Sequence, residues 1–200
     1  MTINLTKGQR VDLDKEAPGL KKIRVGLKWA LKPGQTADLD ASVVLLKANK
    51  DDEPERMLQG GTENTPRGLC YYNHRTHPGI SHMGDSLSGG SNNNDDETIN
   101  IELEKVDAEA DKLLVVCTSY SEGTPMTFGK VASPKLTIYN DETGEALYSF
   151  ELDEDASTAT AVELGRFYRR NGSWRFTALE TIHGSSKNGL ADILAKYYVN

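Results

Sequence analysis

The segment YRRNGSWRF, residues 168–176, indicates the fold class more directly than any other part of the chain. Asn171 and Gly172 stand between two runs in which apolar and polar residues alternate. Both of these residues tolerate a positive φ, which the two-residue turn of a β-hairpin requires. The segment therefore predicts two antiparallel strands joined by a tight turn.

The same period of two recurs along the chain, and the segment KKIRVGLKW, residues 21–29, is the clearest example. Strands with Gly-rich turns at this spacing favour a sandwich. ASVVLLKA, residues 41–48, is apolar throughout, as a strand buried on both faces would be. Further strands are expected within residues 3–13, 69–73, 98–103, 112–120, 135–140 and 146–152.

The C-terminal segment alone has a helical pattern, with Leu190, Ile193, Leu194 and Tyr197 on one face. We therefore predict a mainly all-β protein, an antiparallel β-sandwich of two sheets with a short C-terminal helix. At 200 residues the chain is expected to form one domain, residues 1–200.

The net charge of −7, from 30 acidic and 23 basic residues, argues against a nucleic-acid partner. The basic segment 166–175 is read instead as the solvated face of a hairpin. No run of residues approaches the length of a membrane span, and the first residues, MTINLTKGQR, have no apolar core of a signal peptide. We therefore expect a cytoplasmic protein in which Cys70 and Cys117 stay reduced.

An acidic loop, GDSLSGGSNNNDDE at residues 84–97, holds four carboxylates and several neutral oxygen donors. Calcium prefers six to eight oxygen ligands of these kinds, although the spacing is not that of an EF-hand. A solvated turn rich in Asn, Asp and Gly explains the same composition. The loop therefore leaves both readings open.

A second acidic feature, Asp38 and Asp40, precedes the apolar run 41–48. Residues i and i+2 of a strand point to the same side, so the two carboxylates face one way. They are either half of a cation site or charges that protect an exposed strand edge.

These motifs together resemble the TerD family of tellurite-resistance and stress proteins. The resemblance spans residues 2–198 and is most specific at 38–42 and in the acidic loop. It implies a calcium-binding β-sandwich in which the carboxylates of Asp38, Asp40, Asp85, Asp95, Asp96 and Glu97 are the ligands. It gives Ser86 and Gly89 a role as backbone or neutral oxygen donors.

The loop departs from the usual family pattern, because GGSNNNDDE carries asparagines where relatives carry a further acid. Each asparagine keeps an oxygen but loses a charge. We therefore expect weaker calcium binding, or the loss of one of two adjacent sites.

The resemblance also implies a non-enzymatic stress protein in which calcium orders the acidic loop for partner interaction. The expected partners are calcium and other stress or tellurite-resistance proteins, with peripheral membrane association as a further option. Two alternatives stay open: a metal-dependent hydrolase that uses the same carboxylates with His82 as base, and a module that binds a small ligand through calcium.

Zinc is a weaker alternative, because Cys70, His74, His77 and His82 lack the usual ligand spacing. No nucleophile motif is present. His82 is expected to order the acidic loop.

Overall fold

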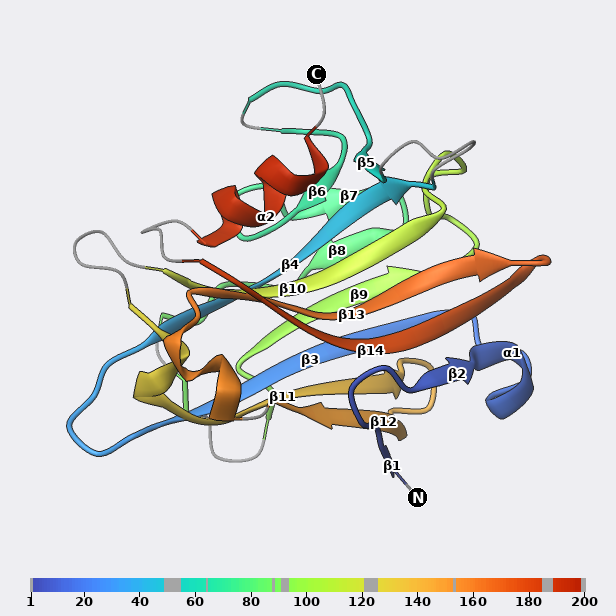
Figure 1. Ribbon diagram of the computed structural model, residues 1–200. Helices are drawn as coiled ribbons and strands as arrows, with labels where there is room; N and C mark the ends of the chain where they lie inside the picture. Colours follow the sequence, from blue (N-terminus) through green and yellow to red (C-terminus); the bar gives the residue numbers. More distant parts are fainter. Residues whose placement is uncertain are drawn as a thin grey trace.

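The computed structural model describes residues 2–48, 55–63, 65–87, 89–90, 94–120, 126–152, 154–184 and 189–198. These residues form two sheets packed face to face, and Figure 1 shows them as stacked layers. One sheet has the strand order β1-β12-β11-β3-β9-β8-β7. The other has the order β2-β14-β13-β10-β4-β5, with β6 also paired to β4. The predicted β-sandwich is confirmed, and most of its strand pairs are antiparallel.

The first sheet consists of β1 (Ile3–Asn4), β12 (Ala146–Glu151), β11 (Val131–Asn140), β3 (Lys22–Leu31), β9 (Glu97–Glu102), β8 (Ile80–His82) and β7 (Thr76–His77). The second consists of β2 (Arg10–Asp12), β14 (Ser173–His183), β13 (Ala161–Arg170), β10 (Lys112–Tyr120), β4 (Asp38–Lys47), β5 (Arg56–Met57) and β6 (Leu69–Cys70). The helical elements are α1 (Leu13–Glu16), η1 (Phe128–Lys130), η2 (Glu154–Thr158) and α2 (Gly189–Tyr197).

The predicted hairpin joins β13 to β14, with Arg170 opposite Ser173. Asn171 has a φ of 54° and Gly172 a φ of 80°, so both turn residues are left-handed. Asparagine and glycine adopt this conformation at the lowest steric cost, which explains why the pair ends one strand and starts the next.

The main core lies between the two sheets, and alternating residues of each strand fill it. Ile23, Val25, Leu27 and Trp29 of β3 are all buried, as their spacing predicted. On β4, Leu39 and Val43 face this core, whereas Val44 and Leu46 belong to a second cluster on the outer face. Ile193 and Tyr197 of α2 cover that second cluster, so β4 is buried on both faces as expected.

Residues 3–13 contain two short strands, β1 and β2, which pair with different sheets. β1 pairs with β12 in a parallel arrangement, whereas β2 pairs with β14 in the other sheet. The chain therefore crosses from one sheet to the other at Lys7–Gly8. Backbone hydrogen bonds far along the chain decide this, and a local pattern carries no sign of them.

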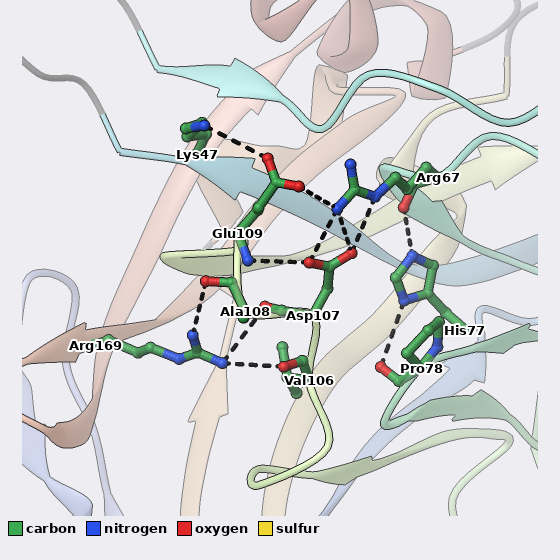
Figure 2. A network of polar contacts seen from close by, with 9 residues as sticks. All are labelled: Lys47, Arg67, His77, Pro78, Val106, Asp107, Ala108, Glu109 and Arg169. Carbon is green, nitrogen blue, oxygen red and sulfur yellow. Dashed lines mark hydrogen bonds and ion pairs between the residues drawn. The ribbon is translucent and has the colours of Figure 1, made fainter.

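A polar network fastens the long connections at one end of the sandwich (Figure 2). The guanidinium of Arg67 donates to both carboxylate oxygens of Asp107, at 2.9 to 3.1 Å, and to Glu109 at 2.7 Å. Arg169 donates to the backbone oxygens of Val106 and Ala108 at 3.1 and 3.2 Å. The network ties the connection before β6 to the β9–β10 connection.

Candidate metal centre

Asp38 and Asp40 begin β4, where their side chains alternate with core residues. Leu39 and Ala41 point into the core between the sheets, so the two aspartates lie on the other face of β4. Across the strand pair, Asp38 lies opposite Tyr120 of β10 and Asp40 opposite Thr118. Only 5% of the surface of Asp40 is exposed, which is unusual for a carboxylate without a salt bridge.

The acidic loop brings a third carboxylate to this pair. Oxygen atoms of Asp38, Asp40 and Asp85 all lie within 4.8 Å of one another. This is the only group of three or more potential metal-binding side chains among the described residues. The structure thus joins two segments that lie 45 residues or more apart in the chain.

The three aspartates repel one another at a site that is partly shielded from water. Burial, followed by the charges of Glu97, Asp38 and Asp85, raises the pKa of Asp40 to about 8. Burial, followed by Asp85 and Glu97, raises the pKa of Asp38 to about 6. Within the described ranges no lysine or arginine forms a salt bridge with any of the three. One oxygen of Asp38, Oδ1, is buried and has no hydrogen-bond partner there either.

Glu97 connects the acidic loop to β4. Its Oε2 accepts a hydrogen bond from the backbone N–H of Ala41 at 2.6 Å, and its Oε1 accepts one from Ser86 N–H at 3.2 Å. His82 Nε2 lies 3.5 Å from Glu97 Oε2, and both side chains are completely buried. His82 also accepts a hydrogen bond from Gly84 N–H at 3.3 Å, which places it in contact with the first residue of the acidic loop.

Asp95 and Asp96, two other expected ligands, accept hydrogen bonds from residues of the first sheet. Asp95 accepts hydrogen bonds from Arg24 Nη1 and Tyr139 Oη, both at 3.2 Å. Asp96 Oδ2 accepts one from the backbone N–H of Trp29 at 2.9 Å. These contacts hold the end of the acidic loop on β3 and β11, outside the group of three aspartates.

Gly89 lies directly on the indole ring of Trp29. A Cβ added at Gly89 would come within 2.1 Å of Trp29 Nε1, so no larger residue fits without movement. Ser86 takes part through its backbone N–H, as described above. Residues 88 and 91–93, which include further expected oxygen donors, lie outside the described residues.

The cysteine and two of the histidines considered as zinc ligands contact backbone oxygens. Cys70 Sγ donates to the oxygen of Arg75 at 3.5 Å, and His74 Nδ1 lies 3.1 Å from the oxygen of Leu69. His77 Nε2 contacts the oxygen of Arg67. Burial raises the pKa of Cys70 to about 11, which disfavours the thiolate that zinc needs. These contacts do not support a zinc site.

Sequence reasoning missed two features of this region. The first is the bridging role of Glu97, for which only its place at the start of a strand gave a signal. The second is a group of tyrosines around Asp40, contributed by β10 and by the segment after β6. The adjacent tyrosines Tyr71-Tyr72 were visible in the sequence, but nothing local placed them near Asp40.

The fold and the site together define a two-sheet β-sandwich protein with three converging aspartates at the start of one strand. A family model described as the TerD domain matches residues 1–197. The chain therefore belongs to the TerD family.

The chain is 38% identical to general stress protein 16U of Bacillus subtilis (strain 168), over 98% of this chain and 97% of that protein. It is 34% identical to tellurium resistance protein TerD of Serratia marcescens, over 100% of this chain and 99% of that one.

A solved structure shares the fold. It is the crystal structure of a homologue of telluride resistance protein (TerD) from Streptomyces coelicolor A3(2), with a TM-score of 0.61 and 22% identity. The match covers 86% of this chain and 95% of that one. Among the described residues no helix is both long and apolar enough to cross a membrane.

Proposed function

We propose that this protein binds calcium at Asp38, Asp40 and Asp85, and that it acts without catalysis in the stress response. The observation that carries the proposal is the convergence of these three carboxylates within 4.8 Å, without a positively charged partner in the described chain. Such a group is electrostatically costly as it stands, and a bound cation would remove the cost.

The donor set suits calcium. Carboxylate oxygens are the hard ligands that calcium prefers, and the unpartnered Oδ1 of Asp38 is available for one such bond. Glu97 adds a fourth negative charge close by, since its charge raises the pKa of both Asp38 and Asp40. Asp95, Asp96, Ser86 and Gly89 then position the loop.

The position of the site suggests how other molecules would recognise the calcium-bound state. Asp85 is exposed and belongs to the acidic loop, whereas Asp38 and Asp40 belong to a buried strand. A cation shared between them would fix the loop to the strand and stabilise that arrangement by mass action. The ordered loop would present a surface to other stress or tellurite-resistance proteins, or to a membrane surface.

The side chains near the site support a non-enzymatic role. Cys117 is completely buried, and burial followed by Glu97 and Asp40 raises its pKa well above the usual range. His82, the base that a hydrolase would need, is buried against Glu97. Neither group is accessible to a substrate. Both cysteines are free, as a cytoplasmic location would require.

Calorimetric titration of the chelator-stripped protein with Ca²⁺ and with Mg²⁺ tests the proposal. We expect Ca²⁺ to bind with a clear preference over Mg²⁺, and the variants Asp40→Asn and Asp85→Asn to lose at least about tenfold in affinity, since each removes a charged ligand. Asp14→Asn, on the exposed surface of α1, is the matched control and keeps wild-type affinity.

One further variant separates a ligand from a positioning residue. If Asp95 only holds the loop on β3, Asp95→Asn weakens calcium binding far less than Asp40→Asn does. If the wild-type protein shows no heat and no shift in melting temperature with Ca²⁺, the calcium proposal is wrong.

A further inference from the structure

A large cleft opens beside the three aspartates, between α2, residues 57–63, residues 66–72 and the ends of β4 and β10. Its volume is about 1030 Å³, which is enough for a small organic molecule. Figure 1 shows α2 lying over β4 and β10, next to the connection that leads to β6. Asp40 lines the cleft, whereas Asp38 and Asp85 do not.

The walls of the cleft are mostly aromatic and aliphatic. Tyr71 and Tyr72 meet edge to face with their ring centres 5.1 Å apart, and Tyr72 meets Tyr120 in the same way at 6.5 Å. Leu190 and Leu194 of α2 also line the cleft. Tyr120 is 44% exposed although it lines a cleft, so a bound molecule could cover a substantial area of its ring.

The charged residues described in the lining of the cleft are all acidic. Its described lining residues include two acids, Asp40 and Glu63, and no lysine, arginine or histidine. Asp40 is 95% buried, and within the described chain it accepts no hydrogen bond and meets no positive charge. Together with Asp38, Asp85 and Glu97 it forms a group of four carboxylates. A divalent ion would leave this group net negative.

We propose that this cleft is a binding site for a small organic cation with an aromatic or apolar body, whose ammonium group lies at Asp40. The apolar body would pack between the tyrosines and α2. Tyrosine rings attract quaternary and primary ammonium groups through their negative faces, and a buried carboxylate adds charge complementarity. This inference concerns a second ligand and does not rest on the calcium proposal.

Two polar networks outside the cleft hold its walls in place, which favours a preformed site. Arg67, bound to Asp107 and Glu109, anchors the segment that contributes Tyr71 and Tyr72 (Figure 2). Glu163 Oε1 of β13 accepts hydrogen bonds from Lys196 Nζ at 2.7 Å and Tyr197 Oη at 3.0 Å, which anchors α2.

The test is a set of calorimetric titrations on chelator-stripped protein, with three compounds of similar size but different charge. The cation is benzyltrimethylammonium, the neutral compound is benzyl alcohol and the anion is benzoate. All titrations are run at about pH 9, well above the ordinary range in which carboxylates take up protons. We expect the cation to bind at least about tenfold more tightly than the alcohol, and benzoate more weakly than either.

Variants then locate the site. Asp40→Asn should reduce the affinity for the cation to that for the alcohol, because it removes the charge at constant volume. Tyr120→Leu should weaken cation binding about threefold or more, since it keeps apolar surface but removes the ring. Tyr168→Leu, at a tyrosine on β13 that does not line the cleft, is the matched control and should leave binding unchanged.

Three results would overturn the inference: equal affinity for the cation and the alcohol, tighter binding of benzoate, or no binding of the cation up to about 10 mM, a limit that corresponds to roughly 3 kcal/mol. Because no calcium is present, none of these results depends on whether the protein binds calcium. Far-UV circular dichroism of each variant confirms that a loss of binding is not a loss of fold.

Discussion

The backbone N–H of Ala41 donates a hydrogen bond of 2.6 Å to the carboxylate of Glu97, which lies in the opposite sheet. β6 pairs with β4 at Val43 and Val44, and among the described residues no strand pairs with β4 at Ala41 on that side. The carboxylate of Glu97 accepts the hydrogen bond of the Ala41 N–H in place of a strand. The same contact brings the end of the acidic loop to the two aspartates of β4.

The bridging role of Glu97 can be tested by Glu97→Gln. The amide nitrogen cannot accept a hydrogen bond, so one of the N–H groups of Ala41 and Ser86 loses its partner. We expect the free energy of unfolding to fall by about 1–3 kcal/mol, as measured by urea denaturation.

Amide hydrogen exchange provides the local measurement for this variant. The N–H of Ala41 or of Ser86 should exchange faster than in the wild-type protein. Glu104→Gln serves as the control, because Glu104 pairs with Lys21 on the exposed surface. Unchanged exchange at both amides would show that Glu97 does not hold the loop.

Asp40 should make the stability of the calcium-free protein depend on pH. Its pKa is about 8 in the folded state, compared with an ordinary value of 3.8, because burial and neighbouring carboxylates disfavour the charged form. The folded state therefore binds the proton more tightly, and this contribution to the free energy of unfolding falls as the pH rises from about 4 to about 8.

Asp40→Asn should accordingly be more stable than the wild type at about pH 9 in chelator, with the difference shrinking toward about pH 4. Thermal melts across this range measure the effect, and Asp14→Asn should follow the wild-type curve. If Asp40→Asn is the less stable protein at high pH, the repulsion inferred at the site is not present.

Calcium binding should release protons near neutral pH. Calcium needs the deprotonated carboxylates, and the pKa values of Asp40 and Asp38 are about 8 and about 6. The affinity for calcium should therefore fall as the pH is lowered from about 8 to about 6. Calorimetry in two buffers with different ionisation enthalpies counts the released protons.

The number of released protons should approach zero above about pH 9, where both carboxylates are already ionised. Addition of Ca²⁺ should also raise the melting temperature, and removal with chelator should reverse the change. A calcium affinity independent of pH over this range would contradict the assignment of Asp40 as a ligand.

The attachment of α2 can be tested by Tyr197→Phe. This change removes the hydroxyl that donates to Glu163 but keeps the ring that packs on Ile193 and the β-sheet. Lys196 and His183 still donate to the same oxygen of Glu163, so we expect a loss of only about 0.5–1.5 kcal/mol in the free energy of unfolding.

Hydrogen exchange should show the effect of Tyr197→Phe mainly in α2, because its anchor to the sheet is weakened. Tyr198→Phe is the control, since Tyr198 is 53% exposed. Equal effects of the two changes would mean that Glu163 does not anchor the helix.

The fold class and the character of the main strands follow from local patterns in the sequence. Alternation of apolar and polar residues along 21–29 indicated the buried face of β3, and the Asn171-Gly172 pair indicated a turn. Both patterns are local consequences of backbone geometry. The apolar run 41–48 indicated a strand, β4, that is buried on both faces. Each of these features depends on residues within a few positions of one another.

Which acidic residues meet depends on long-range packing instead. Asp38, Asp40 and Asp85 converge, whereas Asp95 and Asp96 of the same loop bind Arg24, Tyr139 and the backbone of Trp29. The packing of the two sheets sets this choice, because it places the start of β4 in one sheet beside the residues that follow β8 in the other. The tyrosine cleft at Asp40 arises in the same way, from segments that are brought together by long-range packing and carry no local signal.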